Sequence, residues 1–99
     1  MSEAAINPLE GVFRRSTEID EETFEEDLLL LHQRLRSVVV LNPTAAAVWE
    51  ALKWPQSCSD LAELFVEACA GMDRDVAATQ VAETVRQLVD LGFVLRADP

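Results

Sequence analysis

The stretch SVVVLNPTAAAVWEAL, residues 37–52, decides the fold of this chain. Its three consecutive valines favour a β-strand, because β-branched side chains pack well on a pleated surface. Asn42 is a good N-cap, and Pro43 follows at the first helical position, where its missing N–H costs nothing. Apolar residues then recur at the spacing of one helix face, at Ala45, Val48, Trp49 and Leu52. The stretch therefore predicts a strand that leads directly into an amphipathic helix ended by Pro55, with Trp49 in the core.

A second apolar run, DLLLLH at 27–32, precedes this strand and is separated from it by the polar segment QRLR. Two strands so close in the sequence are expected to pair as an antiparallel hairpin. VFRRST, residues 12–17, is a further strand candidate. Between these runs, EIDEETFEED at 18–27 holds seven of the eighteen Asp and Glu residues and no base. We expect a solvated loop there, the alternative being a docking patch for a basic peptide.

The segment after the first helix carries the pattern of a second one. Asp60 is placed to cap it, Glu63 to bond back to the cap, and Gly71 to end it. Its expected buried face consists of Leu61, Leu64, Phe65 and Ala68. Cys58 and Cys69 are expected on or near this face as small apolar residues.

A third helix is expected to open near Asp73 or Asp75, whose charges suit the positive end of the helix dipole. Its inward stripe is predicted at Ala78, Val81, Val85 and Leu88, with Val89 alongside. Gly92 fits the left-handed position that follows a helix, and FVLR at 93–96 is expected to be a short extended tail.

Strands followed by helices, with no repeat and no internal linker, predict one α+β domain. We expect a winged-helix-like fold in which an N-terminal sheet of two to three antiparallel strands packs on three helices. Residues 12–96 would form this domain, and residues 1–11 a flexible N-terminal arm. Ninety-nine residues, of which 49% are hydrophobic, suffice to bury one core without a metal or a disulfide.

Charge and hydropathy argue against several classes of partner. The formal net charge of −10 repels nucleic-acid phosphates and anionic lipid surfaces. No apolar run approaches the roughly 20 residues of a membrane span, and the N-terminus shows no secretion signal. The two cysteines form no CxxC pair, so we expect both thiols to be reduced and the protein to be cytoplasmic.

No catalytic or metal-binding constellation is visible in the sequence. His32 is the only histidine and has no Ser or Cys nucleophile at motif spacing. Together with Cys58 and Cys69 it supplies fewer than the about four ligands that a zinc site needs, and without finger spacing. The three glycines are scattered singly, which excludes a glycine-rich phosphate loop. We therefore expect no enzyme activity, no cofactor and no metal.

A DNA-binding regulator is the alternative function, because the second and third helices can be read as a helix-turn-helix. A recognition helix offers cations to phosphates. The third helix instead mixes Arg74 and Arg86 with Asp75, Glu83 and Asp90. Lys53 is the only lysine of the chain. The electrostatics therefore disfavour DNA as a partner.

Three segments, RRSTEIDEETFEEDLLLLHQRLRSVVVLNPTAAAVWEAL, SDLAELF and VRQLVDLGFV, together resemble the PqqD family, the peptide chaperones of pyrroloquinoline-quinone biosynthesis. Relatives of that family are recognition elements of ribosomally synthesised, post-translationally modified peptides. The resemblance covers residues 14–94 and is most specific at residues 28–52. It implies a non-catalytic domain that binds the leader segment of a precursor peptide and presents it to a modifying enzyme, such as a radical-SAM enzyme, a cyclase or a leader peptidase. The product could be the quinone cofactor, a lasso peptide or another modified peptide.

The resemblance also implies where the leader binds. It adds as a strand to the third strand of the sheet, here residues 37–41, in the groove beside the third helix, here roughly residues 75–91. An open strand edge presents unpaired N–H and C=O groups, and a cognate peptide is one way to cover it. The N-terminal arm is another. Alternate side chains are expected in the core, at Val39 and Leu41, and on the opposite face, at Val38 and Val40.

Helical spacing and the resemblance together select residues for the groove. One flank of the inward stripe carries Ala77, Gln80, Thr84 and Leu91, and the other carries Ala82, Arg86 and Val89. The family's variable, ligand-facing positions lie on the first flank, which implies that Gln80 and Thr84 line the groove. Arg34 and Arg36, in the hairpin turn, could hold an acidic leader residue or be solvated turn charges. The predicted peptide-binding residues are Arg36, Ser37, Val38, Val39, Val40, Ala77, Gln80, Val81 and Thr84.

Overall fold

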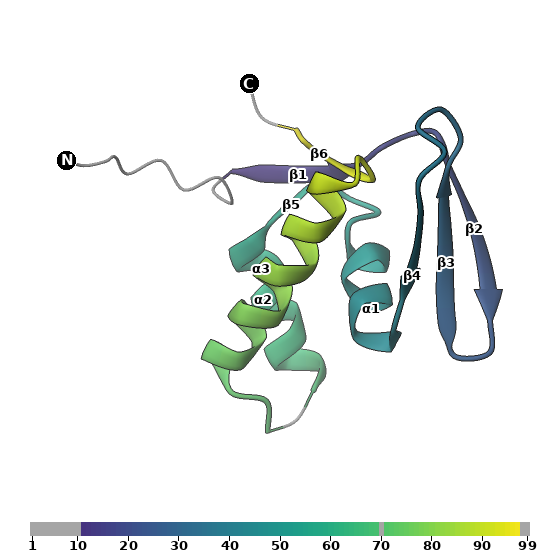
Figure 1. The fold of residues 1–99 in the computed structure, drawn as a ribbon. Helices are drawn as coiled ribbons and strands as arrows, with labels where there is room; N and C mark the ends of the chain where they lie inside the picture. Colours follow the sequence, from purple (N-terminus) through teal and green to yellow (C-terminus); the bar gives the residue numbers. More distant parts are fainter. Residues whose placement is uncertain (1–10, 70, 98–99) are drawn as a thin grey trace.

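The computed structural model describes residues 11–69 and 71–97 (Figure 1). Along the chain the elements are β1 (Val12–Arg15), β2 (Ile19–Phe24), β3 (Asp27–His32), β4 (Val38–Leu41), α1 (Pro43–Ala51), β5 (Gln56–Ser57), α2 (Cys58–Ala68), α3 (Arg74–Asp90) and β6 (Val94–Arg96). The strands form two three-stranded antiparallel sheets, ordered β2-β3-β4 and β5-β1-β6. The expected α+β, winged-helix-like class is confirmed. Apart from Gly11, the expected arm at 1–11 lies outside the described residues.

The sheet β2-β3-β4, called the meander below, stands beside α1 in Figure 1. β3 pairs with β4 from Leu28 opposite Leu41 to Leu31 opposite Val38. The hairpin expected between residues 27–32 and 37–41 is therefore confirmed. One face of the meander supplies Leu30, Val39 and Leu41 to the core.

The acidic run does not form the loop that we expected. Most of it is the strand β2, which pairs with β3 from Ile19 opposite His32 to Phe24 opposite Asp27. Glu25, with a φ of 57°, and Glu26 make the turn between the two strands. The side chains from position 20 to 24 stay exposed because β2 lies at the sheet edge, while its backbone satisfies the polar groups of β3. The sequence did not predict this strand because charged residues are rare in buried strands. They are common in edge strands, and β2 is one.

α1 follows β4 as the sequence predicts. Asn42 accepts a hydrogen bond through Oδ1 from the Ala45 N–H at 2.8 Å, and Pro43 occupies the first turn. Trp49 is 1% exposed, so its assignment to the core is confirmed. The Arg15 guanidinium lies 4.4 Å from the centre of the Trp49 ring and also donates to the Trp49 carbonyl oxygen at 2.7 Å. This cation–π contact and hydrogen bond fix β1 to α1.

α2 begins earlier than the sequence suggests. Ser57, not Asp60, is the N-cap, and its Oγ accepts a hydrogen bond from the Asp60 N–H at 3.1 Å. Asp60 is thus already inside the first turn, and Glu63 pairs with Arg74 instead of bonding back to the cap. The buried residues are Leu61, Ala62 and Phe65, whereas Leu64 and Ala68 are exposed. The face that packs on α3 is centred nearer to position 62 than we expected, which turns these two residues toward solvent.

α3 is capped by Asp73, whose Oδ1 accepts a hydrogen bond from the Asp75 N–H at 2.7 Å. Its buried residues are Ala77, Val81, Val85 and Leu88. Two predictions are therefore wrong, because Ala78, expected inward, is exposed, and Ala77, expected on the flank, is buried. The stripe continues back from Val81 with a spacing of four residues, not three. Because Ala77 and Ala78 are identical neighbours, the sequence pattern does not distinguish a spacing of three residues from a spacing of four.

β1 joins the second sheet and not the meander. It pairs with β5 on one side and with β6 on the other, so the strand candidate at 12–17 meets the expected tail at 93–96. Figure 1 shows this sheet across one end of the helices. The meander has three strands, as the prediction allowed. The strand that joins β3 and β4 in it is β2, however, and not the predicted strand at 12–17. The two residues of β5 are too few to show a pattern in the sequence.

One hydrophobic core joins both sheets to the three helices. Its largest fully buried side chains are Trp49, Phe13, Phe93, Leu30, Leu41, Leu52, Leu61 and Leu88. Among the helices that the structure describes, none has the length and apolar character needed to cross a membrane.

Candidate functional site

The first feature of the site is the open edge of β4. This strand has β3 on one side and, within the described residues, no strand on the other. Its side chains alternate as predicted, because Val39 and Leu41 are buried while Val38 and Val40 are 55% and 58% exposed. β4 is thus a short apolar edge strand that is open to pairing.

The register shows which backbone groups β4 offers. The His32 N–H donates to the Ser37 carbonyl oxygen at 2.8 Å, so these two residues form a hydrogen-bonded pair. Bonded and non-bonded pairs alternate along an antiparallel ladder. The N–H and C=O groups of Val38 and Val40 therefore point away from β3, toward the open edge. An added strand would pair with these two residues.

A hollow of about 290 Å³ lies beyond the end of β4, between the start of α1 and α3. Its lining is Asn42, Thr44, Ala45, Gln80, Glu83, Thr84 and Gln87. Gln80 and Thr84, both half-buried, are two of the residues that the sequence selects for a groove beside this strand. Most of the lining side chains carry hydrogen-bonding groups, so the hollow suits a ligand with polar atoms.

Gln80, which lines this hollow, has a buried acceptor without a partner. Its Oε1 is buried and accepts no hydrogen bond from any described residue. A buried polar atom without a partner costs about 1–3 kcal/mol. The Gln80 side chain would therefore gain by rotating so that its amide hydrogen-bonds to a ligand in the hollow. Ala77 and Val81, also predicted to bind peptide, lie fully buried on the core side of the same helix and offer no surface.

Arg36 and Ser37 lie at the other end of β4. Arg36 is exposed in the turn after β3, with a φ of 60°, and forms no ion pair with a described carboxylate. Arg34 in the same turn is already paired with Glu18 at 3.3 Å. Arg36 is therefore the available cation at this end. The four residues of β4 separate Arg36 from the hollow, so the predicted residues with accessible side chains lie along the open edge and do not form a cluster.

Sequence reasoning missed five residues of the hollow, namely Asn42, Thr44, Ala45, Glu83 and Gln87. Asn42 was interpreted only as a helix cap, although a cap at the end of a strand also borders the strand's open edge. The signal for the other α3 residues was present in the sequence. Positions 80, 83, 84 and 87 are all polar and share one face of the helix, next to the buried stripe.

Comparisons with known proteins identify the family. The sequence model of the family coenzyme PQQ synthesis protein D (PqqD) matches residues 27–94. The chain belongs to the PqqD family. It is similar to a lasso peptide synthetase B1 complexed with the leader peptide, with a TM-score of 0.70 and 29% identity over 84% of this chain and 96% of that chain. It shares its fold with TbiB1 in complex with the TbiA(beta) leader peptide, with a TM-score of 0.73 and 13% identity over 87% of this chain and 99% of that chain. No curated protein matches its sequence.

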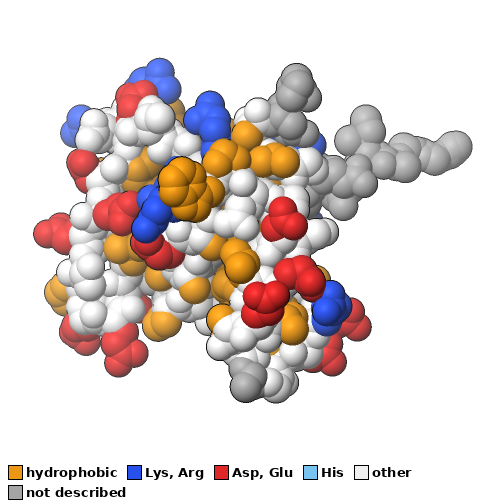
Figure 2. Space-filling view, turned by 180° about the vertical axis from the view of Figure 1, so that it is seen from behind, with side chains coloured by type: hydrophobic (Ala, Val, Ile, Leu, Met, Phe, Trp, Pro, Cys, Tyr) orange, Lys and Arg blue, Asp and Glu red, His pale blue; other side chains and the backbone are white. Residues whose placement is uncertain are grey.

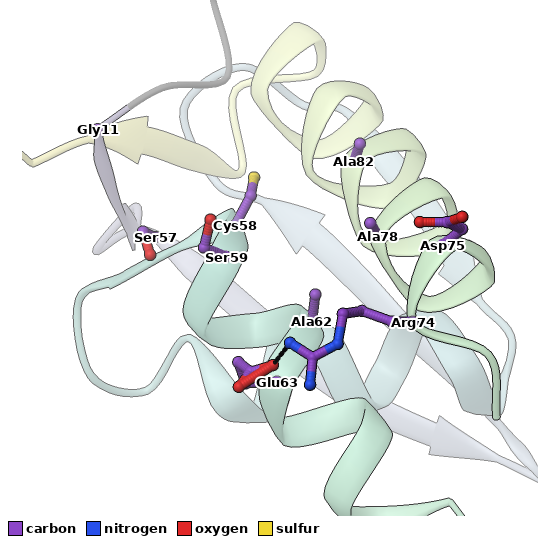
Figure 3. A pocket seen from close by; sticks show the side chains of 10 residues that line it. All are labelled: Gly11, Ser57, Cys58, Ser59, Ala62, Glu63, Arg74, Asp75, Ala78 and Ala82. Carbon is purple, nitrogen blue, oxygen red and sulfur yellow. Dashed lines mark hydrogen bonds and ion pairs between the residues drawn. The ribbon is translucent and has the colours of Figure 1, made fainter. Parts of the chain in front are cut away.

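This PqqD-family chain has a second hollow, of about 700 Å³, between α2 and α3 (Figure 3). Figure 3 shows Ala62 of α2 opposite Ala78 and Ala82 of α3, with the Arg74 side chain reaching across to Glu63. The two alanines of α3 lie on the flank opposite to the polar face at positions 80 and 84. α3 therefore separates this hollow from the open edge of β4.

Two reactive groups of the PqqD-family chain are held in structural positions. His32 is 2% exposed; its Nδ1 accepts a hydrogen bond from the Leu35 N–H at 3.2 Å, and its Nε2 lies 3.4 Å from Ser16 Oγ. Burial raises the pKa of the Cys58 thiol, which keeps it protonated and weakly nucleophilic. The part of the chain that the structure describes contains no group of three His, Cys, Asp or Glu side chains placed to hold a metal ion.

Proposed function

We propose that this chain is a non-catalytic recognition protein that binds the leader segment of a ribosomally made precursor peptide and presents it to a modifying enzyme. The observation that carries the proposal is the open apolar edge of β4, with a hollow beyond its end, in a member of the PqqD family. A solved B1 protein with 29% identity to this chain is complexed with a leader peptide, which supports the same role here.

The leader adds to β4 as a fourth strand of the meander. Its backbone pairs with the outward N–H and C=O groups of Val38 and Val40, which supplies affinity without depending on the leader's sequence. Side chains of the leader that reach the hollow meet Gln80 and Thr84, and a polar one can hydrogen-bond to the Gln80 amide once that side chain rotates to expose its Oε1. Selectivity therefore arises at the hollow, while affinity arises along the strand.

Binding to DNA is disfavoured by the charges around α3. Arg74, at its start, is already paired with Glu63. Arg86 shares the exposed surface of the helix with Glu83 and Asp90. The formal net charge of −10 also opposes approach to a phosphate backbone.

Calorimetry tests the proposal, with the precursor peptides encoded beside the gene and a duplex DNA as ligands. We expect a precursor peptide to bind and the duplex not to bind. Thr84→Arg fills the hollow and should weaken peptide binding at least about tenfold, or 1.4 kcal/mol. Ala78→Arg is the matched control, because position 78 is exposed on the opposite flank of α3.

Two results would contradict the proposal. Tight binding to the duplex without binding to any precursor peptide would identify a regulator. If Thr84→Arg folds normally and binds the leader as well as the wild type, the peptide does not lie between β4 and α3.

A further inference from the structure

The meander has a second apolar surface, on the face turned away from the core. The register places Leu29 and Val40 opposite each other on this outer face, and likewise Leu31 and Val38. Phe24, opposite Asp27 at the end of β2, is 68% exposed. None of these side chains belongs to the hydrophobic core. We call the surface formed by Phe24, Leu29, Leu31, Val38 and Val40 the outer face.

The outer face is hollowed at one end and not flat. A cavity of about 440 Å³ is lined by Glu22, Thr23, Phe24, Asp27, Leu29 and Val40. Its apolar walls are Phe24, Leu29 and Val40, one from each strand of the meander. A cavity of this kind suits one or a few apolar side chains of a partner, as at the centre of many protein interfaces.

Carboxylates border this apolar surface. Asp20 and Glu22 share the outer face with Leu31 and Leu29, which lie opposite them on β3. Glu22, Glu26 and Asp27 have no Arg or Lys partner among the described residues, although β2 is part of the most acidic run of the chain. Figure 2 shows acidic side chains along the margin of the molecule that the meander forms, with hydrophobic side chains among them. The surface therefore combines an apolar centre with an acidic border.

We propose that the outer face docks the modifying enzyme to which the leader is presented, through an apolar anchor of that enzyme surrounded by Lys and Arg. The inference rests on the proposed function, because a protein that presents a peptide must hold its enzyme at the same time. A leader strand extends the sheet in its own plane, so the outer face stays accessible while the edge of β4 is occupied.

Charge complementarity selects this occupant over a second copy of the chain. Two copies joined through the outer face would bring two acidic borders together, which opposes association. An anionic membrane surface is repelled for the same reason. A basic rim on a partner enzyme instead pairs with Glu22 and Asp27 around the apolar anchor. Such charges raise the association rate and make the affinity depend on salt.

The experiment measures two affinities for each variant, one for the leader and one for the modifying enzyme encoded beside the gene. Phe24→Lys and Leu29→Lys place a cation in the apolar centre, and we expect each to weaken enzyme binding at least tenfold. Leader affinity should stay within twofold, because neither position lies on β4. Val76→Lys is the control, since Val76 is a comparably exposed apolar residue at the start of α3.

A charge reversal tests the border separately. Glu22→Lys should weaken enzyme binding and reduce its dependence on salt, while leaving leader binding unchanged. Thermal melts identify any variant that fails to fold, and the exposed position of Phe24 makes Phe24→Lys the variant that carries the test if Leu29→Lys is unstable.

Three results would overturn the inference. One is enzyme affinity that Phe24→Lys leaves unchanged, or that Val76→Lys lowers equally. Another is the absence of binding to the encoded enzyme while leader binding is intact. The third is a concentration-dependent dimer in sedimentation that Phe24→Lys abolishes, which would assign the outer face to a second copy. Absence of leader binding by the wild type would instead contradict the proposed function, so the two failures are distinguishable.

Discussion

β2 and β4 form the two edges of the same meander and differ in what they show to solvent. β2, with the sequence IDEETF, carries three carboxylates; Asp20 accepts a hydrogen bond from Gln33, and Glu21 pairs with Arg15. β4, with the sequence VVVL, carries no charge. Charged side chains on an edge strand discourage further pairing, because an added chain would have to desolvate them. Of these two edges, β4 alone lacks this protection, which supports the proposal that it binds a ligand strand.

The largest expected effect tests the core that holds both edges in place. Trp49→Ala should lower the free energy of unfolding by about 3–5 kcal/mol, since the ring is buried beneath Arg15 and its removal leaves a large cavity. Trp54→Ala is the control, because Trp54 is 71% exposed, and it should change stability by less than about 0.5 kcal/mol. Urea unfolding measures both. Unchanged stability of Trp49→Ala together with lost leader affinity would place Trp49 in the peptide site.

A matched pair of proline variants tests the comparison of the edges directly. The Gln33 N–H donates to the Glu18 carbonyl oxygen at 2.8 Å, so by alternation the N–H of Thr23 points to the open edge of β2 as that of Val40 does at β4. Val40→Pro should weaken leader binding at least about tenfold, or 1.4 kcal/mol, by removing one outward donor. Thr23→Pro removes the equivalent donor on β2 and should leave leader binding unchanged.

Both proline variants should remain folded, because neither removes a hydrogen bond to β3 and proline is tolerated at edges. Calorimetry gives the leader affinities, and circular dichroism gives the melting temperatures. Equal loss of leader affinity in the two variants would show that the leader does not distinguish the edges.

Removing the protection of β2 should give a smaller effect. The double variant Asp20→Val, Glu22→Val turns β2 into an apolar edge, and we expect it to self-associate at concentrations where the wild type is monomeric. Glu83→Val with Asp90→Val makes the same change of net charge on the exposed surface of α3 and serves as the control. Sedimentation equilibrium measures association. If the control associates equally, net charge and not edge protection explains the difference.

The two edges also show how far the sequence predicts this fold. β4 and α1 were predictable because the valines, the Asn42 cap and Pro43 all favour the same strand-to-helix junction. β2 was not, since its pairing depends on β3 needing a partner and not on any preference of its own acidic residues. The prediction that Ala78 and not Ala77 faces the core was wrong, because the side of α3 that meets the core is set by tertiary packing.

The site was predictable in part for the same reason. Spacing along one helix groups Gln80 and Thr84 on one flank, the family resemblance selects that flank, and both residues do line the hollow. Asn42 and Thr44 come from a different element, and only the packing of α1 beside α3 brings them there. Spacing identifies which residues share a face, but the opposing wall of a groove requires the fold.

The smallest expected effect separates the two hollows on either flank of α3. In a Cys69→Ser variant the remaining thiol is Cys58, which lines the hollow between α2 and α3. Because burial raises the pKa of the Cys58 thiol, its alkylation by iodoacetamide should be slower than in the urea-unfolded chain and should increase only at higher pH. Saturating leader should change the folded-state rate by less than twofold, since the proposed leader site lies on the opposite flank, along β4. Strong protection of Cys58 by the leader would place the peptide between α2 and α3, and the open edge of β4 would then need another explanation.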